Sequence, residues 1–430
     1  MYTAKDIRNL ALLGHGGDGK SALCESMLYV TKAITRLGKR ADGTTVSDFD
    51  DEEKKRQYSI KTSVIPVEFG GCKLNVLDNP GYFDFAAEIV QSLRVADAGL
   101  ICLTAKSGIA VGTEKGWKSL ADAGLPAMFY VSKLDEEHAN FFNTFDSLRD
   151  IFGASVIPFT FPILHGEEAV GVVDLVSKKA YDVSGKEIAL PAEAEEKIEE
   201  YMAELNEQVA ETDEVLMEKF FEGEELTQEE IKDAIRKATI NCTMNPVCCG
   251  TSYRNKGVQP LLDNIVEYMP SPLDIPAIKG TDPHDPEKEM VRHPSDSEPF
   301  SALAFKIMVD PFVGKLSLFR IFSGMLSGQT TLYNPGKDKT EKCGGIYILR
   351  GKKQVVKESL HAGDIGAMAK LQYTSTGDTL CDPANPVIYP PIEYPKPCIS
   401  KAVYAAKQGE EDKVFSGLQR LMEEDPSVTL

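Results

Sequence analysis

The chain has 430 residues and a formal net charge of −19 at neutral pH. Its length predicts two or three domains, and its negative charge argues against nonspecific binding to nucleic acid or to membrane surfaces. The polar beginning MYTAKDIRNL, the lack of a membrane-length apolar run and nine cysteines without a C-x-x-C pair lead us to expect a cytoplasmic protein with reduced, buried thiols and no zinc.

The first predicted strand, NLALLG, runs into the glycine-rich stretch GHGGDGKS and then into ALCESMLYV, which has helical spacing. The pattern G-x-x-x-x-G-K-[ST] describes a loop whose backbone N–H groups surround phosphates, with the lysine reaching the terminal phosphates and the hydroxyl ligating Mg²⁺. A glycine-rich turn can also bind nothing, but an anion at a helix N-terminus meets unpaired N–H groups and the positive end of the dipole. We predict a nucleotide phosphate site formed by His15, Gly16, Gly17, Asp18, Gly19, Lys20, Ser21 and Ala22.

Further apolar runs follow at KLNVLD, GLICLT, AMFYVS and, far downstream, NPVCCG. Strands that alternate with helical segments predict a parallel α/β sheet with helices on both faces, which binds ligands at the carboxyl ends of its strands. Asp78-Asn79-Pro80-Gly81 follows the second of these strands. There, Asp78 can hold Mg²⁺ through water and the Gly81 N–H can contact a γ-phosphate, although D-x-x-G alone is a common turn.

Two more motifs follow later strand ends. Ser132-Lys133-Leu134-Asp135 stands where GTPases read guanine with N-K-x-D. The carboxylate accepts hydrogen bonds from guanine N1–H and the 2-amino group, and the lysine stem packs on the base. Gly250-Thr251-Ser252 follows NPVCC, where a backbone amide would contact guanine O6. Each tetrapeptide is weak evidence by itself, but their order at successive strand ends predicts a guanine nucleotide site.

Residues from about 155 to 243 interrupt this pattern. Within them, residues 193–233 carry seventeen acidic and three basic side chains, a net −14 of the chain's −19. Apolar residues with helical spacing predict an acidic amphipathic helical insert, whose charged face is either solvated or a docking surface for a basic partner. These residues are Ile198, Tyr201, Met202, Leu205 and Val209.

After the insert, YMPSPLDIPAIKGTDPHDPEKE is rich in proline and charge and predicts a linker. The runs SALAFKIMVD, LSLFRIFSG, QTTLYNPG, EKCGGIYILRG, DIGAMAKL and DTLCDP then predict a small antiparallel β-barrel. In the last stretch, EDKVFSGLQRLMEEDPSVTL, an apolar helical face needs a cover, so we expect the front part of a longer protein. That face consists of Val414, Phe415, Leu418, Leu421 and Met422.

These motifs, together with RNKGVQPLLDNIVEYMPSPLDIPAIKG and LQRLMEEDPS, resemble the front part of bacterial elongation factor G, a translational GTPase, over essentially the whole chain. The resemblance implies a P-loop GTP-binding domain at 1–280 with the inserted subdomain at about 155–243, a β-barrel domain at 281–400, and the opening strand and helix of a third domain at 401–430. It implies GTP or GDP and Mg²⁺ as ligands, the ribosome as partner, contact of the insert with the ribosomal stalk protein, and a monomer.

The resemblance implies that residues of this chain at the family's motif positions have the same roles. They give Lys20, Gly81 and residue 82 to catalysis, and Ser21, Ser59 and Asp78 to the metal. Where the family's switch II has histidine to position the attacking water, this chain has Tyr82, which lacks a group that can be cationic near the γ-phosphate.

Other departures also surround the nucleotide. In switch I the family has R-G-I-T, whereas this chain has Arg56-Gln57-Tyr58-Ser59, which keeps a hydroxyl but loses the glycine. In the phosphate loop Gly17 replaces the family's aspartate. At the guanine site Ser132 replaces an asparagine that braces neighbouring loops. We expect a ribosome-associated GTPase that promotes or modulates tRNA–mRNA translocation with slowed hydrolysis. The alternatives are a GTP-binding ribosome regulator that hydrolyses little, and a ribosome recycling or protection factor.

Overall fold

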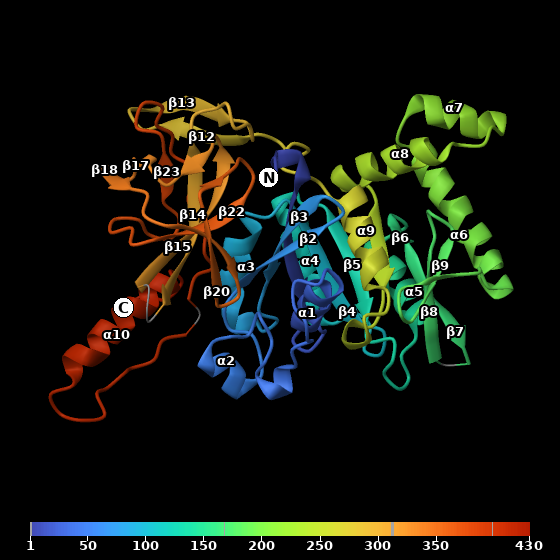
Figure 1. Ribbon diagram of the computed structural model, residues 1–430, viewed down its shortest axis with the longest axis horizontal. Helices are drawn as coiled ribbons and strands as arrows, with labels where there is room; N and C mark the ends of the chain where they lie inside the picture. The colour runs from blue at the N-terminus through green and yellow to red at the C-terminus, as the bar shows by residue number, and fades with distance from the viewer. Residues whose placement is uncertain (1, 167, 311–313, 398) are drawn as a thin grey trace. The chain divides into compact units, whose positions relative to one another are not determined.

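The computed structural model describes residues 2–166, 168–310, 314–397 and 399–430 (Figure 1). They fall into two compact units. The first comprises Arg8–Phe83 and Ala96–Ile275, and the second comprises the residues up to Ile7, Asp84–Val95 and Pro276–Leu430.

A seven-stranded sheet with the order β2-β3-β1-β4-β5-β11-β6 dominates the first unit. All five predicted strands are present in it, but the sheet is mixed, because β2 pairs antiparallel with β3. The stretch SVIPVEF was missed as a strand; it folds back through Gly70-Gly71, both at positive φ, which glycine adopts without steric cost. The strands are β1 (Ile7–Gly14), β2 (Ser63–Phe69), β3 (Cys72–Asp78), β4 (Ala98–Thr104), β5 (Ala127–Ser132), β6 (Val156–Pro158) and β11 (Asn245–Cys249).

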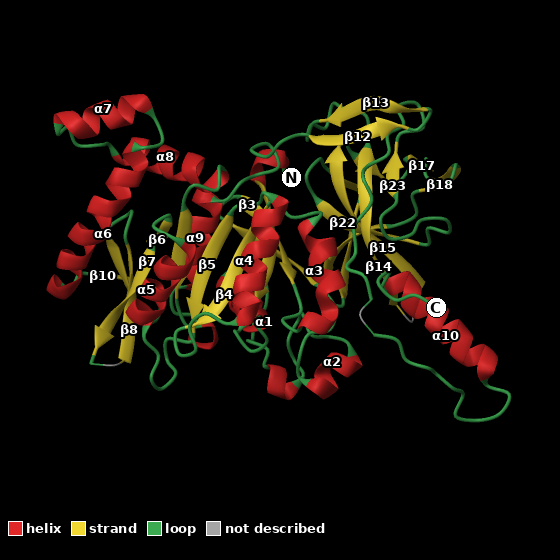
Figure 2. Cartoon of the chain, turned by 180° about the vertical axis from the view of Figure 1, so that it is seen from behind, coloured by secondary structure: helices red, strands yellow, loops and turns green. Residues whose placement is uncertain are grey.

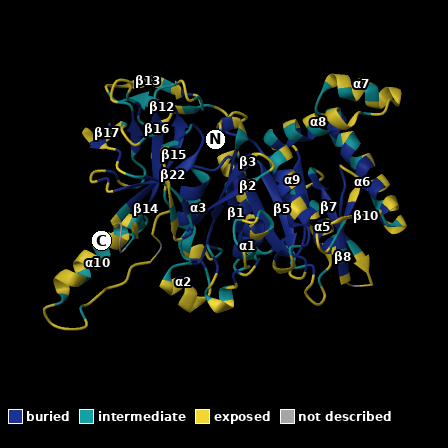
Figure 3. Ribbon diagram, viewed as in Figure 1, coloured by how far each residue is buried: buried dark blue, intermediate teal, exposed yellow. Residues whose placement is uncertain are grey.

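Helices join and cover these strands (Figure 2). Helix α1 packs against β2, β3 and α9, whereas α4 packs against β4 and α5 against β6. The strand residues beneath them are almost all buried (Figure 3), as expected for strands with helices over them. The helices are α1 (Lys20–Val30), α2 (Asp51–Arg56), α4 (Val111–Ala123), α5 (Phe141–Phe152) and α9 (Val258–Tyr268).

The acidic part of the insert is helical, as predicted, but the insert also contains strands that the sequence analysis did not predict. Its first half is a four-stranded antiparallel sheet of β7 (Thr160–His165), β8 (Glu168–Asp174), β9 (Lys179–Asp182) and β10 (Glu187–Ile188). These strands are too short and too mixed in polarity to have been recognised singly. The acidic half forms α6 (Ala192–Ala210), α7 (Glu214–Glu222) and α8 (Gln228–Ile240), and the predicted apolar face of α6 is buried as expected.

In the second unit, the predicted linker contains a β-hairpin of β12 (Ile278–Asp282) and β13 (Asp285–Arg292). Cross-strand pairing satisfies its backbone although its side chains are mostly charged or exposed. The predicted antiparallel β domain follows as an eight-stranded sheet with the order β18-β17-β23-β14-β15-β22-β19-β20, and a β16-β21 pair. Its strands are β14 (Ser301–Asp310), β15 (Gly314–Ser323), β16 (Leu326–Ser327), β17 (Thr331–Asn334), β18 (Lys339–Lys342), β19 (Ile346–Arg350), β20 (Lys353–Lys357), β21 (Ser359–Leu360), β22 (Ile365–Ala369) and β23 (Thr379–Cys381).

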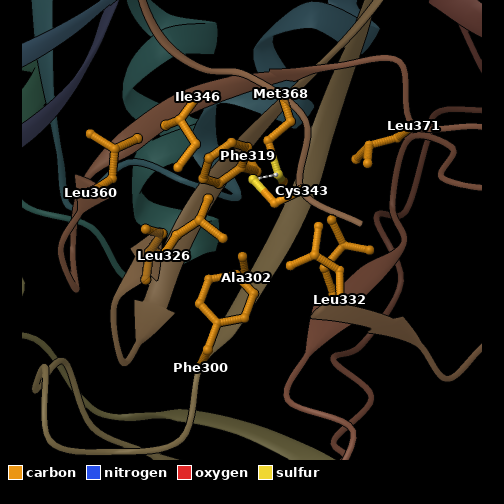
Figure 4. Close-up of a cluster of buried hydrophobic side chains, with 12 residues drawn as sticks. Phe300, Ala302, Phe319, Leu326, Leu332, Cys343, Ile346, Leu360, Met368 and Leu371 are labelled. Carbon is orange, nitrogen blue, oxygen red and sulfur yellow. Dashed lines mark hydrogen bonds between the residues drawn. The ribbon is translucent and has the colours of Figure 1, made fainter. Parts of the chain in front are cut away.

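A cluster of buried side chains holds this β domain together (Figure 4). Phe319 from β15 and Met368 from β22 are fully buried there, and the Cys343 thiol lies 3.7 Å from the Met368 sulfur. Figure 4 shows side chains from several strands converging on this point. Burial of such side chains, worth about 1.5–3 kcal/mol each, stabilises the sheet.

Helix α3 (Ala86–Leu93), which follows the predicted switch II, belongs to the same compact unit as the β domain. The buried Lys306 of β14 forms an ion pair with Glu88 of α3, and Arg320 of β15 donates to the Val95 carbonyl over 3.0 Å. Removing one partner of a buried ion pair leaves an uncompensated charge, so these contacts fix α3 against the β domain.

The last helix, α10 (Glu411–Glu424), has no buried residue, and Phe415 on its apolar face is 56% exposed. No strand forms in residues 399–410 or after α10, contrary to the prediction, because a strand needs a neighbour to pair its backbone groups. Seven of the eight described cysteines are buried; Cys242 is exposed, against the expectation, and Cys398 lies outside the described residues. Among the described residues, we find no helix with the length and apolar character needed to span a membrane.

Candidate nucleotide-binding site

The predicted phosphate loop connects β1 to α1 and consists of residues 14–19. Gly14, Gly17 and Gly19 all have positive φ, and Gly19 is the residue that precedes the first turn of α1. At Gly14 a Cβ atom would lie only 2.2 Å from the Cys102 carbonyl oxygen, so glycine is required there. The glycines therefore let the loop wrap tightly against β4 and deliver its N–H groups to the start of the helix.

Lys20 is buried and points back into this loop. Its Nζ donates to the carbonyl oxygens of Gly14, over 2.9 Å, and His15, over 2.8 Å. Burial lowers the pKa of Lys20, while the charge of Asp78 opposes that shift. The Asp18 carboxylate accepts from the His15 N–H at 2.7 Å, and burial raises its pKa. The loop is thus held in a closed form by its own side chains.

The predicted switch II crosses directly above the loop. A Cβ atom on Gly81 would lie 2.5 Å from Lys20 Nζ and 2.7 Å from the Gly16 nitrogen, so only glycine allows this approach. The Tyr82 ring covers Gly16 and meets the Tyr58 ring with 4.8 Å between centroids, while Tyr82 remains 43% exposed. The residue expected to face the attacking water therefore lies over the phosphate loop.

The three predicted metal-binding residues also come together. The Ser21 and Ser59 hydroxyl oxygens are 3.3 Å apart, and Ser59 donates to Asp48 over 2.7 Å. Both carboxylate oxygens of Asp78 are buried, close to the Ser21 and Ser47 hydroxyls. Burial raises the pKa of Asp78 to about 6, and the nearby Asp48 adds to the shift. Carboxylate and hydroxyl oxygens gathered at one buried place are ligand types that fit a divalent cation.

The predicted base-reading residues lie at the end of β5. Ser132 Oγ donates to the Asp18 carbonyl over 2.7 Å, so the residue that replaces asparagine still braces the phosphate loop. Lys133 has φ of +59° and pairs with Glu136, 2.9 Å away. Asp135 is paired with Arg254, whose Nε is 3.1 Å from its carboxylate. The carboxylate expected to read the base is thus held by an internal cation.

Gly250, Thr251 and Ser252 form a tight loop after β11. Thr251 and Lys256 exchange both backbone hydrogen bonds, and a Cβ atom on Gly250 would lie 2.2 Å from the Lys256 carbonyl oxygen. The Ser252 carbonyl accepts from Ser26 of α1. These contacts tie the loop to the helix that starts at the phosphate loop, so both parts of the site share one frame.

Comparisons with known proteins agree with this geometry. Residues 5–271 match the family described as Elongation factor Tu GTP binding domain, 299–383 match Elongation factor G domain 2, and 394–430 match Elongation Factor G, domain III. The chain belongs to the elongation factor G-like translational GTPases. It is also similar to a crystal structure of a protein from Thermus thermophilus, with 32% identity, a TM-score of 0.88 and coverage of 99% of this chain. The chain spans 62% of that protein's length.

Four residues of this elongation factor G-like site were missed by the sequence analysis: Arg40, Asp48, Tyr58 and Arg254. Arg40 donates to Ser21, Ser59 and Asp48, and the other three contact predicted site residues as described above. Tyr58 and Arg254 lie in stretches that the sequence analysis quoted, but without a role, and no motif singles out Arg40 or Asp48. Their partners could not be predicted, because they are set by the path of the chain between the regular elements.

Gln57 of this translational GTPase occupies a backbone conformation that favours glycine. It ends α2 with φ of +58° and ψ of +36°, and it is exposed. A side chain in the left-handed region costs about 1 kcal/mol, so Gln57→Gly is expected to stabilise this turn by about 1 kcal/mol relative to Gln57→Ala. Hydrogen exchange of the amides from 57 to 61 measures this difference, and equal exchange in the two variants would contradict it.

Proposed function

We propose that this chain binds GTP with Mg²⁺ and acts in a ribosome-associated GTPase that promotes or modulates tRNA–mRNA translocation. The observation that supports it best is the convergence of Lys20, Ser21, Gly81 and Asp78 around one phosphate loop. The Asp135 and Gly250 loops follow neighbouring strands of the same sheet. Residues 1–280, 281–400 and 401–430 are the domains within this proposal.

In this proposal the residues have distinct roles. The loop amides of residues 15–22 and the Lys20 ammonium bind the phosphates, and Lys133 and Asp135 bind guanine. Ser21 and Ser59 would hold Mg²⁺ directly and Asp78 through water. When bound, the ion neutralises phosphate charge during phosphoryl transfer.

Switch II supplies the groups nearest the reacting phosphate. The Gly81 N–H contacts the γ-phosphate, and the Tyr82 hydroxyl orients the attacking water by donating and accepting hydrogen bonds. Tyrosine cannot become cationic, so it gives less electrostatic stabilisation to the developing charge than histidine. GTP hydrolysis by this chain is therefore expected to be slower than hydrolysis at a site that has histidine at this position.

The position of Tyr82 favours a second candidate function, a GTP-bound ribosome regulator that hydrolyses little. Tyr82 packs on Tyr58 and lies over Gly16, and this packing must rearrange before its hydroxyl can orient water. A switch held in this way would prolong the GTP-bound state on the ribosome.

Binding of a fluorescent GTP analogue, followed by single-turnover hydrolysis by the full-length protein with and without ribosomes, tests the proposal. Submicromolar binding with a ribosome-stimulated rate supports the translocation-type enzyme. Binding without appreciable stimulation supports the regulator, and absence of guanine nucleotide binding would refute both.

The insert supports a proposed contact with the ribosomal stalk protein. Helix α7 has no buried residue and exposes Val215, Phe220 and Phe221, of which Phe221 is 80% exposed. These aromatic side chains lie within the strongly acidic segment 193–233. Apolar anchors surrounded by negative charge suit a partner with a complementary basic rim.

Phe221→Ala is expected to lower ribosome-stimulated hydrolysis about tenfold, because one fully buried aromatic anchor contributes about 1–2 kcal/mol at an interface. Hydrolysis without ribosomes should not change. Val183→Ala, at an exposed apolar residue of the insert's β9–β10 turn, is the control. A loss shared by both variants, or by neither, would argue against α7 as the contact.

A further inference from the structure

Arg40 lies where the proposed metal ion would bind. It belongs to a short 3₁₀ turn, Arg40–Asp42, in the segment between α1 and β2. Its Nη2 donates to Ser21 over 2.8 Å and to Ser59 over 3.1 Å, and its Nε donates to the buried Asp48 over 2.8 Å. One guanidinium therefore binds the hydroxyls that the proposed function gives to Mg²⁺.

These contacts join the start of α1 to the segment that follows it, which Glu25 of α1 also holds by accepting from the Gly38 and Val46 N–H groups. Ser21 belongs to the first turn of α1, whereas Arg40, Asp48 and Ser59 belong to the segment 31–62, which we call switch I. Ser59 also donates to Asp48 over 2.7 Å, which closes a ring of charge-assisted hydrogen bonds. The arginine thus holds switch I against the start of α1.

The guanidinium and a metal ion compete for these oxygens. Mg²⁺ requires ligand oxygens at about 2.0–2.1 Å in octahedral geometry, which leaves little room for a guanidinium within 3.1 Å of the same two hydroxyls. Two positive groups at such short range also repel each other strongly.

Arg40 is one of the side chains around the cavity at the phosphate loop. This cavity measures about 130 Å³ and is lined by the loop glycines together with Arg40, Tyr58, Gly81 and Tyr82. Arg40 therefore borders the space in which the phosphates would lie. Arg40, 29% exposed at its side chain, borders solvent and can leave towards it.

We propose that Arg40 is an internal cation that occupies the magnesium position in the metal-free protein and is exchanged for Mg²⁺ when the nucleotide binds. This inference rests on the proposed GTP–Mg²⁺ site and concerns its regulation. The exchange keeps switch I ordered when the site is empty. It also makes the apparent affinity for Mg²⁺ lower than that of the bare oxygens, since the arginine competes with the ion.

Hydrogen exchange of the nucleotide-free protein in EDTA tests the first consequence. Arg40→Ala is expected to speed exchange of the amides in residues 40–61 about tenfold or more, because the charged bonds that hold them are lost. Arg36→Ala, at an exposed arginine of the same segment, is the control and should match the native protein. Arg40→Lys, which keeps the charge but not the fork of donors, should lie between them. Unchanged exchange in Arg40→Ala would overturn the proposal.

The second consequence is measured by the release of a fluorescent GDP analogue at increasing Mg²⁺ concentrations. The concentration that slows release by half should fall about three- to tenfold in Arg40→Ala, because the competing cation is absent. If that Mg²⁺ concentration is unchanged or higher in Arg40→Ala, the proposed exchange of arginine for Mg²⁺ is overturned, while the proposed function stands. If neither native protein nor variant binds the analogue, the proposed function fails and the exchange fails with it.

Discussion

Asp135→Asn is expected to weaken GDP binding about 100-fold or more and to make xanthosine diphosphate the preferred ligand. The Asp135 carboxylate offers two acceptors, which match the N1–H and 2-amino donors of guanine. Asparagine presents one acceptor and one donor, so its amide faces the 2-amino group of guanine with like polarity. Xanthine has a carbonyl at that position, which accepts from the asparagine amide.

Titration of GDP and xanthosine diphosphate against the native and variant proteins measures this change in base preference. Glu136→Gln is the matched control, since it neutralises the neighbouring carboxylate, which pairs with Lys133. Arg254→Ala separates the two roles of Asp135, because it removes the internal partner of the carboxylate and should not change base preference. A uniform loss for both ligands in Asp135→Asn would mean that this residue does not read the base.

Tyr82→His is expected to raise the ribosome-stimulated rate of single-turnover hydrolysis about 10- to 100-fold. Position 82 lies over Gly16 at the phosphate loop, next to the Gly81 backbone. A histidine there can carry positive charge near the developing negative charge and can orient water at the same time. It also removes the ring contact between Tyr82 and Tyr58, which frees switch II to rearrange.

The control for Tyr82→His is Tyr58→His, which breaks the same ring contact but places the imidazole on switch I. A gain limited to Tyr82→His assigns the effect to the position of the imidazole. An equal gain in both variants assigns it to the broken contact between the two tyrosines. Fast hydrolysis by the native protein with no further gain would instead show that Tyr82 is a working substitute.

The sequence determined those parts of this protein in which neighbouring residues decide the outcome. The five strands from NLALLG to NPVCCG are apolar and four of them are followed by a motif, and the structure places all five in one sheet. GHGGDGKS forms the expected loop, since glycines with positive φ and a lysine that begins a helix are local requirements. The apolar spacing of α6 likewise predicted which of its faces is buried.

Only the tertiary structure decided the rest, because it depends on pairings between distant residues. The β7–β10 sheet and the β12–β13 hairpin are stabilised mainly by cross-strand partners, and their sequences carry no clear alternation of their own. In the site, Arg40 meets Ser21 and Ser59, each nineteen residues away, through an irregular segment. A charged side chain in such a segment has no periodicity to reveal its partner. Its position is set by the fold that surrounds it, where burial makes an unpaired hydroxyl or carboxylate costly.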